Sequence, residues 1–119
     1  MDVPDEGYRH IGRCKDLETL TLMYCRETGD RATEHITGMQ KLRRYFARYT
    51  CATDRTPELL ATIDSLEEVE MYGIPAVTDA GIAKLARLPR LRTLNVSGQN
   101  ISAAVADPFP PHVKVTWEL

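Results

Sequence analysis

The chain has no long apolar run, few aromatic residues and almost no net charge, and each shortage excludes a class of protein. No stretch of the 119 residues approaches a membrane span in length, and the first ten residues lack signal-peptide character. The net charge of −2, from 15 basic and 17 acidic side chains, argues against a dedicated nucleic-acid binder. At this length we expect a single domain, residues 1–119.

Cysteine is scarce as well. The 3 cysteines are odd in number and form no C-x-x-C pair, so a reducing compartment suits them and we expect a cytoplasmic protein. Cys14 falls at an apolar position, which predicts a buried, inert thiol. Cys25 and Cys51 could form a redox or metal pair, but no further soft ligands lie near them in the sequence. We interpret both as turn residues.

Motifs for catalysis are missing too. The sequence contains no phosphate loop, dinucleotide fingerprint, nucleophile elbow or H-E-x-x-H. Glu67, Glu68 and Glu70 could suggest acid–base chemistry, but nothing apolar is arranged to raise their pKa, so we interpret them as a solvated face. His10 and His35 occupy similar positions without a third ligand for zinc. We therefore predict no enzyme, no cofactor and no metal site.

What the sequence does contain is concentrated in residues 77–96. Thr78 can cap a helix whose apolar residues recur three apart, at Ile82, Leu85 and Leu88. Pro89 ends that helix, and an L-x-x-L-x-L strand pattern follows from Leu91. These twenty residues predict one helix and one strand.

The same pattern recurs. Strand-like segments begin at Leu17, Leu42, Leu66 and Leu91, at intervals of about 25 residues. We expect helices over residues 30–38, with Ile36 and Met39 inward, and from residue 56, with Thr56 as cap, Pro57 first in the helix and Leu59, Leu60 and Ile63 on its apolar face. Residues 3–17 align without a gap onto residues 77–91, so the chain is expected to start within a repeat. The predicted divisions are a partial repeat (3–16), full repeats (17–41, 42–65 and 66–90) and a C-terminal repeat with its cap (91–119).

Alternation along the strands predicts which side chains point inward. We expect near-complete burial of eight residues: Leu20, Leu22, Tyr45, Val69, Met71, Leu94, Val96 and Val115. A last strand should place Val113, Val115 and Trp117 on one side, so that the large aromatic closes the end. The outward positions should form three rows across the sheet: Thr19, Arg44, Glu68, Thr93 and His112; Thr21, Phe46, Glu70, Asn95 and Lys114; Met23, Arg48, Tyr72, Ser97 and Thr116.

Residues 78–96 (T-D-A-G-I-A-K-L-A-R-L-P-R-L-R-T-L-N-V) and 14–25 (C-K-D-L-E-T-L-T-L-M-Y-C) resemble leucine-rich repeats of the cysteine-containing, RNI-like type. They look like the bacterial V-T-D-A-G-L repeat proteins and the mitochondrial proteins similar to ATP synthase coupling factor B. The resemblance implies a short right-handed solenoid, with a parallel sheet of about five strands on the concave face and helices on the convex face. The family has no catalytic residues to carry over.

On this resemblance we expect a non-catalytic protein-interaction module that uses its concave strand face. It could be the C-terminal part of a longer protein. Two other readings stay open: an assembly factor of a membrane-bound complex, and a recognition domain attached to an enzyme. The predicted partner-binding residues are outward on the strands: Met23, Arg44, Phe46, Arg48, Glu68, Glu70, Tyr72 and Asn95. We also expect the unpaired edge strand over residues 19–23 to be covered by the residues before Val3, by upstream sequence or by another copy.

Overall fold

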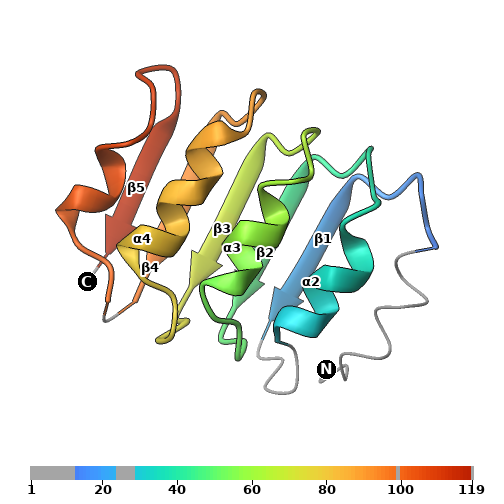
Figure 1. Ribbon diagram of the computed structural model, residues 1–119, viewed down its shortest axis with the longest axis horizontal. Helices are drawn as coiled ribbons and strands as arrows, with labels where there is room; N and C mark the ends of the chain where they lie inside the picture. Colours follow the sequence, from blue (N-terminus) through green and yellow to red (C-terminus); the bar gives the residue numbers. More distant parts are fainter. Residues whose placement is uncertain (1–12, 24–28, 99, 119) are drawn as a thin grey trace.

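The computed structural model describes residues 13–23, 29–98 and 100–118 of the chain. Five strands form one parallel sheet, and their spatial order follows their order in the chain (Figure 1). Each of the first four begins two residues after the leucine that heads its pattern: β1 (Thr19–Met23), β2 (Arg44–Arg48), β3 (Glu68–Tyr72), β4 (Thr93–Ser97) and β5 (Lys114–Glu118). This confirms the α/β class and the predicted number of strands.

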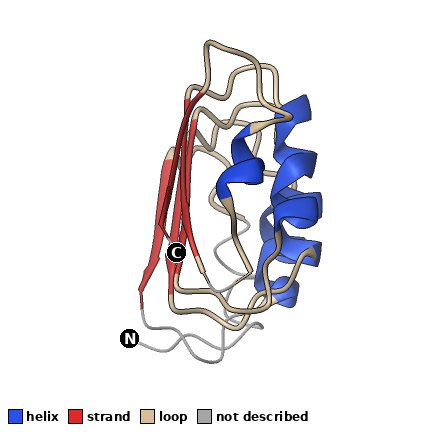
Figure 2. Ribbon diagram, turned by 90° about the vertical axis from the view of Figure 1, so that its left-hand side faces the viewer, coloured by secondary structure: helices blue, strands red, loops and turns tan. Residues whose placement is uncertain are grey.

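The described helices all lie on one side of the sheet (Figure 2). They are short: α2 (Asp30–Ile36), α3 (Arg55–Leu60), α4 (Asp79–Ile82) and the 3-10 helices η2 (Ala83–Arg87) and η3 (Ala103–Ala106). The helix predicted over residues 30–38 therefore ends at Ile36, and the one after Thr78 changes to 3-10 geometry at Ala83. Helices of this length are marginal in isolation, so packing against the sheet must hold them. None in the described ranges is long and apolar enough to cross a membrane.

The core lies between the sheet and the helices. Ile36 and Met39 are buried as predicted, and seven of the eight predicted inward strand residues are 8% exposed or less: Leu20, Leu22, Tyr45, Val69, Met71, Leu94 and Val96. Val115 is the exception, since it is only partly buried. Leu59 is half-buried rather than part of the apolar face of α3. The strand register was therefore predicted correctly over the first four strands.

The last strand departs from the prediction. Thr93 pairs with Lys114 rather than with His112, so every outward row is shifted by two residues at β5. Paired residues lie 25, 24 and 25 residues apart over the first four strands, but only 21 apart between β4 and β5. The proline-rich segment before β5 is shorter than a full helix connection, which sets the new register. Trp117 shares the inward side with Val96 but is 38% exposed, so it does not close the end.

Two further local predictions are wrong. Cys14 is exposed instead of buried. Thr56 does not cap a helix: α3 begins at Arg55, and the Thr56 hydroxyl is fully buried, where it donates to Asp30 Oδ1 at 2.7 Å. A carboxylate contributed by α2 has taken the hydroxyl that the local pattern assigned to the helix end. The Thr78 cap is confirmed, because its Oγ1 accepts the Gly81 N–H.

Three aspartates join successive segments in one repeated contact, which we name the carboxylate ladder. In each step one carboxylate accepts both the backbone N–H and the hydroxyl of a Thr or Ser on the next segment. The backbone distances are 2.9, 2.7 and 2.9 Å for Asp30 with Thr53, Asp54 with Thr78, and Asp79 with Ser102. Two charge-assisted hydrogen bonds per step fix the spacing between neighbouring helix starts.

Candidate functional site

The side of the sheet away from the helices carries the predicted partner-binding residues, and we name it the strand face (Figure 2). Register brings together two rows that the sequence predicted over β1 to β4: Thr19, Arg44, Glu68 and Thr93; Thr21, Phe46, Glu70 and Asn95. In the third row, Met23 lies opposite Arg48, and Arg48 opposite Tyr72. The side chain of Met23 lies outside the described part of the chain.

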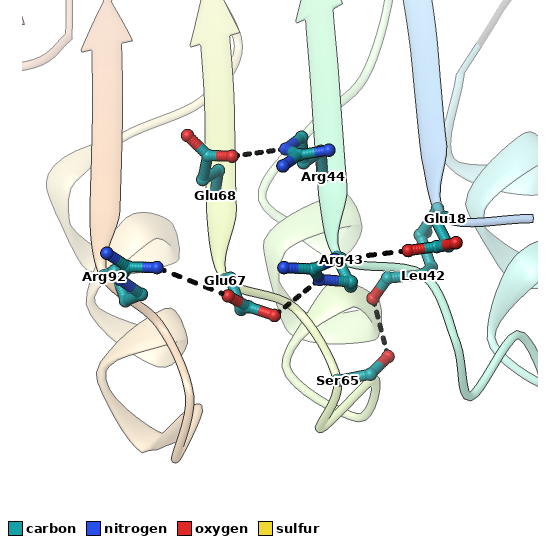
Figure 3. Close-up of polar contacts among 8 residues, drawn as sticks. All are labelled: Glu18, Leu42, Arg43, Arg44, Ser65, Glu67, Glu68 and Arg92. Carbon is teal, nitrogen blue, oxygen red and sulfur yellow. Dashed lines mark hydrogen bonds and ion pairs between the residues drawn. The ribbon is translucent and has the colours of Figure 1, made fainter.

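Arginine and glutamate side chains pair across β2 and β3. Arg44 Nε lies 2.5 Å from Glu68 Oε2, as the sequence predicted (Figure 3). Arg48 binds Glu70 through two hydrogen bonds, of 2.9 and 3.1 Å. Glu70 is consequently only 14% exposed, so the expected solvated acidic face is instead a set of ion pairs. Glu67, at the amino end of β3, is likewise paired with Arg43.

Arg48 makes a second contact, with Tyr72. Its guanidinium lies 5.1 Å from the centre of the tyrosine ring, which confirms the predicted cation–π contact. The hydrogen bonds from Glu70 raise the pKa of Arg48 above its usual value. Because Arg48 is held by an anion and a ring at once, it presents a fixed donor group beside the aromatic side chains.

Phe46 sits in the middle of this arrangement and is half-buried. A hollow of about 350 Å³ lies at its ring, lined by Thr21, Phe46, Arg48 and Glu70. An aromatic ring with a paired arginine beside it matches the composition of interface hot spots. The hollow could therefore receive a side chain of a partner.

Tyr49 follows β2 and has an unusual backbone. Its φ of 56° lies in the left-handed region, and so does the φ of 63° at Gly73, which occupies the matching place after β3. A Cβ at Gly73 would lie 2.5 Å from the Tyr49 ring, so the glycine makes room for that ring, which is still 50% exposed. A non-glycine residue held in this region is strained, and such strain concentrates at functional sites. No local sequence signal marks this, because only the alignment with Gly73 exposes it.

A second polar cluster lies at the amino ends of the strands. Arg43 bonds Glu18 on one side and Glu67 on the other, at 3.2 and 2.7 Å (Figure 3). Arg92 approaches Glu67 from β4 at 3.7 Å. The hydrogen bond from Arg43 holds the pKa of Glu67 below its usual range, and the same bond raises that of Arg43.

This cluster borders a hollow of about 350 Å³ lined by Glu18, Gln40, Lys41, Arg43, Ser65, Glu67 and Arg90. Ser65 is not a free nucleophile there, since its hydroxyl donates to the Leu42 carbonyl at 2.6 Å. Within the described ranges no three histidine, cysteine or acidic residues gather as metal ligands. His10 and Cys25 lie outside those ranges, while His35 and Cys51 are exposed.

The chain matches no protein-family model, and a comparison with curated proteins found no relative. The geometry of the strand face is therefore the main guide to function.

Proposed function

We propose that this chain is a short leucine-rich-repeat solenoid and that its strand face binds a protein partner without catalysing a reaction. The near-constant spacing of the first four strands, together with the carboxylate ladder that links each helix start to the next, supports the repeat. Exposed Cys14 suits a reducing compartment, so the proposed location is the cytoplasm.

The observation that carries the proposal is the hollow at Phe46. It is lined by a half-buried aromatic ring, a threonine and the Arg48–Glu70 pair, and it lies at the centre of the helix-free side. Anchors of this kind cluster near the middle of interfaces, where a rim of weaker contacts excludes water. Around it the proposed contact residues are Met23, Arg44, Glu68, Tyr72 and Asn95.

Charge matching narrows the chemistry of the partner. Arg44 faces Glu68 and Arg48 faces Glu70, so the centre of the strand face has no excess of either sign. We therefore expect recognition through aromatic packing and hydrogen bonds rather than through an oppositely charged patch. Binding should then depend only weakly on ionic strength, because salt mainly screens long-range attraction between unlike charges.

The test begins with affinity capture on the immobilised chain, followed by titration of the purified captured protein against variants. Phe46→Ala should weaken binding by about 1–3 kcal/mol, the usual span for a truncated aromatic anchor. It should change the free energy of unfolding by less than about 1 kcal/mol, because a strand-face position leaves no core cavity. Circular dichroism and urea unfolding check the second expectation.

Glu34→Ala is the matched control on the helix side, where Glu34 is exposed and makes only a 3.7 Å ion pair with Arg55. This control should leave binding unchanged. If Phe46→Ala and Tyr72→Ala bind like wild type while Glu34→Ala binds poorly, the partner site lies on the helices and the proposal is wrong. A titration measured at low and high salt separates aromatic from ionic recognition.

A further inference from the structure

The C-terminal edge of the sheet differs from the N-terminal edge in what it exposes. At β1 the inward residues Leu20 and Leu22 are buried to 8% and 5% exposure. At β5 the inward residue Val115 is only partly buried, and Trp117 is 38% exposed. A strand edge with uncovered apolar side chains is a place where another strand can add.

The backbone of β5 presents a defined set of hydrogen-bonding groups at this edge. The Lys114 N–H donates to Arg92 O at 2.8 Å, so the backbone of Lys114 points toward β4. Successive residues of a strand direct their N–H and C=O groups to opposite edges. Val115 and Trp117 therefore direct theirs outward, and no described strand pairs with that edge.

The sequence of β5, K-V-T-W-E, is complementary to itself when two copies run antiparallel. With Thr116 opposite the Thr116 of a second copy, Val115 lies opposite Trp117, and Lys114 opposite position 118, a glutamate in the sequence. The two residues with outward backbone groups then face each other, which is the hydrogen-bonded pairing of an antiparallel ladder. An aromatic residue beside a β-branched one and opposite charges are both favourable cross-strand pairs.

We propose that two copies of this chain associate through β5 into a symmetric dimer with one continuous sheet. The two-fold axis passes through Thr116, perpendicular to the sheet, so each contact occurs twice. This axis keeps both strand faces on the same side of the dimer. The assembly can therefore engage two partner molecules, or two sites of one partner, with the gain in avidity that follows.

The same alignment disfavours β1 as the self-pairing edge. An antiparallel pair centred on Thr21 would join T-L-T-L-M to itself and match no opposite charges. Its leucines are already covered by the core of their own chain. Five residues of edge pairing make a small interface, so the dimer should be weak and should dissociate on dilution.

Fluorescence can follow Trp117 directly, because it is the chain's single tryptophan. We expect its emission to shift to the red as the protein is diluted, in parallel with dissociation seen by sedimentation equilibrium. Thr116→Lys puts two ammonium groups opposite each other at the axis and should raise the dimer dissociation constant about tenfold or more. Thr19→Lys makes the same change at β1, also on an exposed residue, and should have no effect.

A charge exchange removes the remaining ambiguity. Lys114→Glu should weaken the dimer, and adding Glu118→Lys to it should restore wild-type association at unchanged net charge. Circular dichroism must show that each variant is folded. A wild-type chain that stays monomeric at millimolar concentration would overturn the proposal, as would a dimer that survives Thr116→Lys or one disrupted by Thr19→Lys instead.

Discussion

The two sides of the sheet differ in how tightly each position constrains its residue, although both are built from the same strands. On the helix side, side chains such as Val69 and Leu94 are almost completely buried. On the strand face, Phe46 is half-buried and the charged residues around it satisfy one another in pairs. Packing density fixes the first side, whereas the second has room to vary and so can be used for recognition.

The largest expected difference between the sides comes from adjacent residues of β4. Leu94→Ala removes a fully buried side chain and should lower the free energy of unfolding by about 2–5 kcal/mol. Asn95→Ala, one position along on the strand face, should change it by less than about 0.5 kcal/mol. Urea unfolding of both variants measures the contrast. Similar losses at the two positions would show that the strand face contributes to folding as much as the core.

The carboxylate ladder gives the next effect on the helix side. Asp54→Ala removes both acceptors of Thr78 and should cost about 1–2 kcal/mol. Asp64→Ala is the control, because Asp64 is exposed and near-neutral replacement is the rule there. A loss of stability in the control equal to that at Asp54 would contradict a specific role for the ladder.

Gly81 sharpens this prediction, since a Cβ there would collide with the Asp54 carboxylate. Alanine normally stabilises a helix relative to glycine by roughly 0.5–1 kcal/mol. Here we expect Gly81→Ala to destabilise the wild-type chain, and to regain the normal stabilising effect when combined with Asp54→Ala. A double-mutant cycle of unfolding free energies detects the coupling, and additive effects would refute it.

Acid should act on the ladder in a predictable direction. Burial opposes ionisation of Asp30, but hydrogen bonds from Thr53 and Thr56 outweigh it and hold the Asp30 pKa below its ordinary 3.8. Around that pH the unfolded chain binds more protons than the folded one, so stability is present above 3.8 and is lost as the pH falls through the lowered pKa.

Asp30→Asn should therefore reduce the loss of stability between pH 7 and about pH 3. Some acid dependence should remain, because Glu67 also has a lowered pKa through Arg43. Unfolding free energies at several pH values test this. An identical pH dependence in the variant would mean that the hydrogen bonds to Asp30 do not favour its ionised form.

The smallest effect belongs to the strand face. The Arg44–Glu68 pair is short, but its side chains are 41% and 39% exposed. Arg44→Gln should cost only about 0.2–1 kcal/mol of folding stability, and the coupling in a cycle with Glu68→Gln should shrink in high salt. A coupling above about 2 kcal/mol would place this pair among structural contacts and blur the contrast between the two sides.

Parts of this contrast were predictable from the strand patterns. Alternation fixed the inward set from Leu20 to Val96, because a one-residue slip would have buried Arg44 and Arg48. The same alternation placed Phe46, Glu68 and Tyr72 on the outward side, and the pairing of Arg44 with Glu68 followed from the 24-residue spacing. Where the spacing changed to 21 residues, at β5, the prediction failed.

Hydrophobic periodicity thus determined by itself that strands and helices alternate and which side chains enter the core, since burial depends on local spacing. Tertiary structure alone decided how polar groups are paired. The Asp30–Thr56 contact joins residues 26 apart, and Arg48 chooses Glu70 as well as Tyr72 because three side chains meet across two strands. The exposure of Trp117 likewise depends on what the last helix leaves uncovered. Such choices depend on distances between segments, which no local pattern of residues encodes.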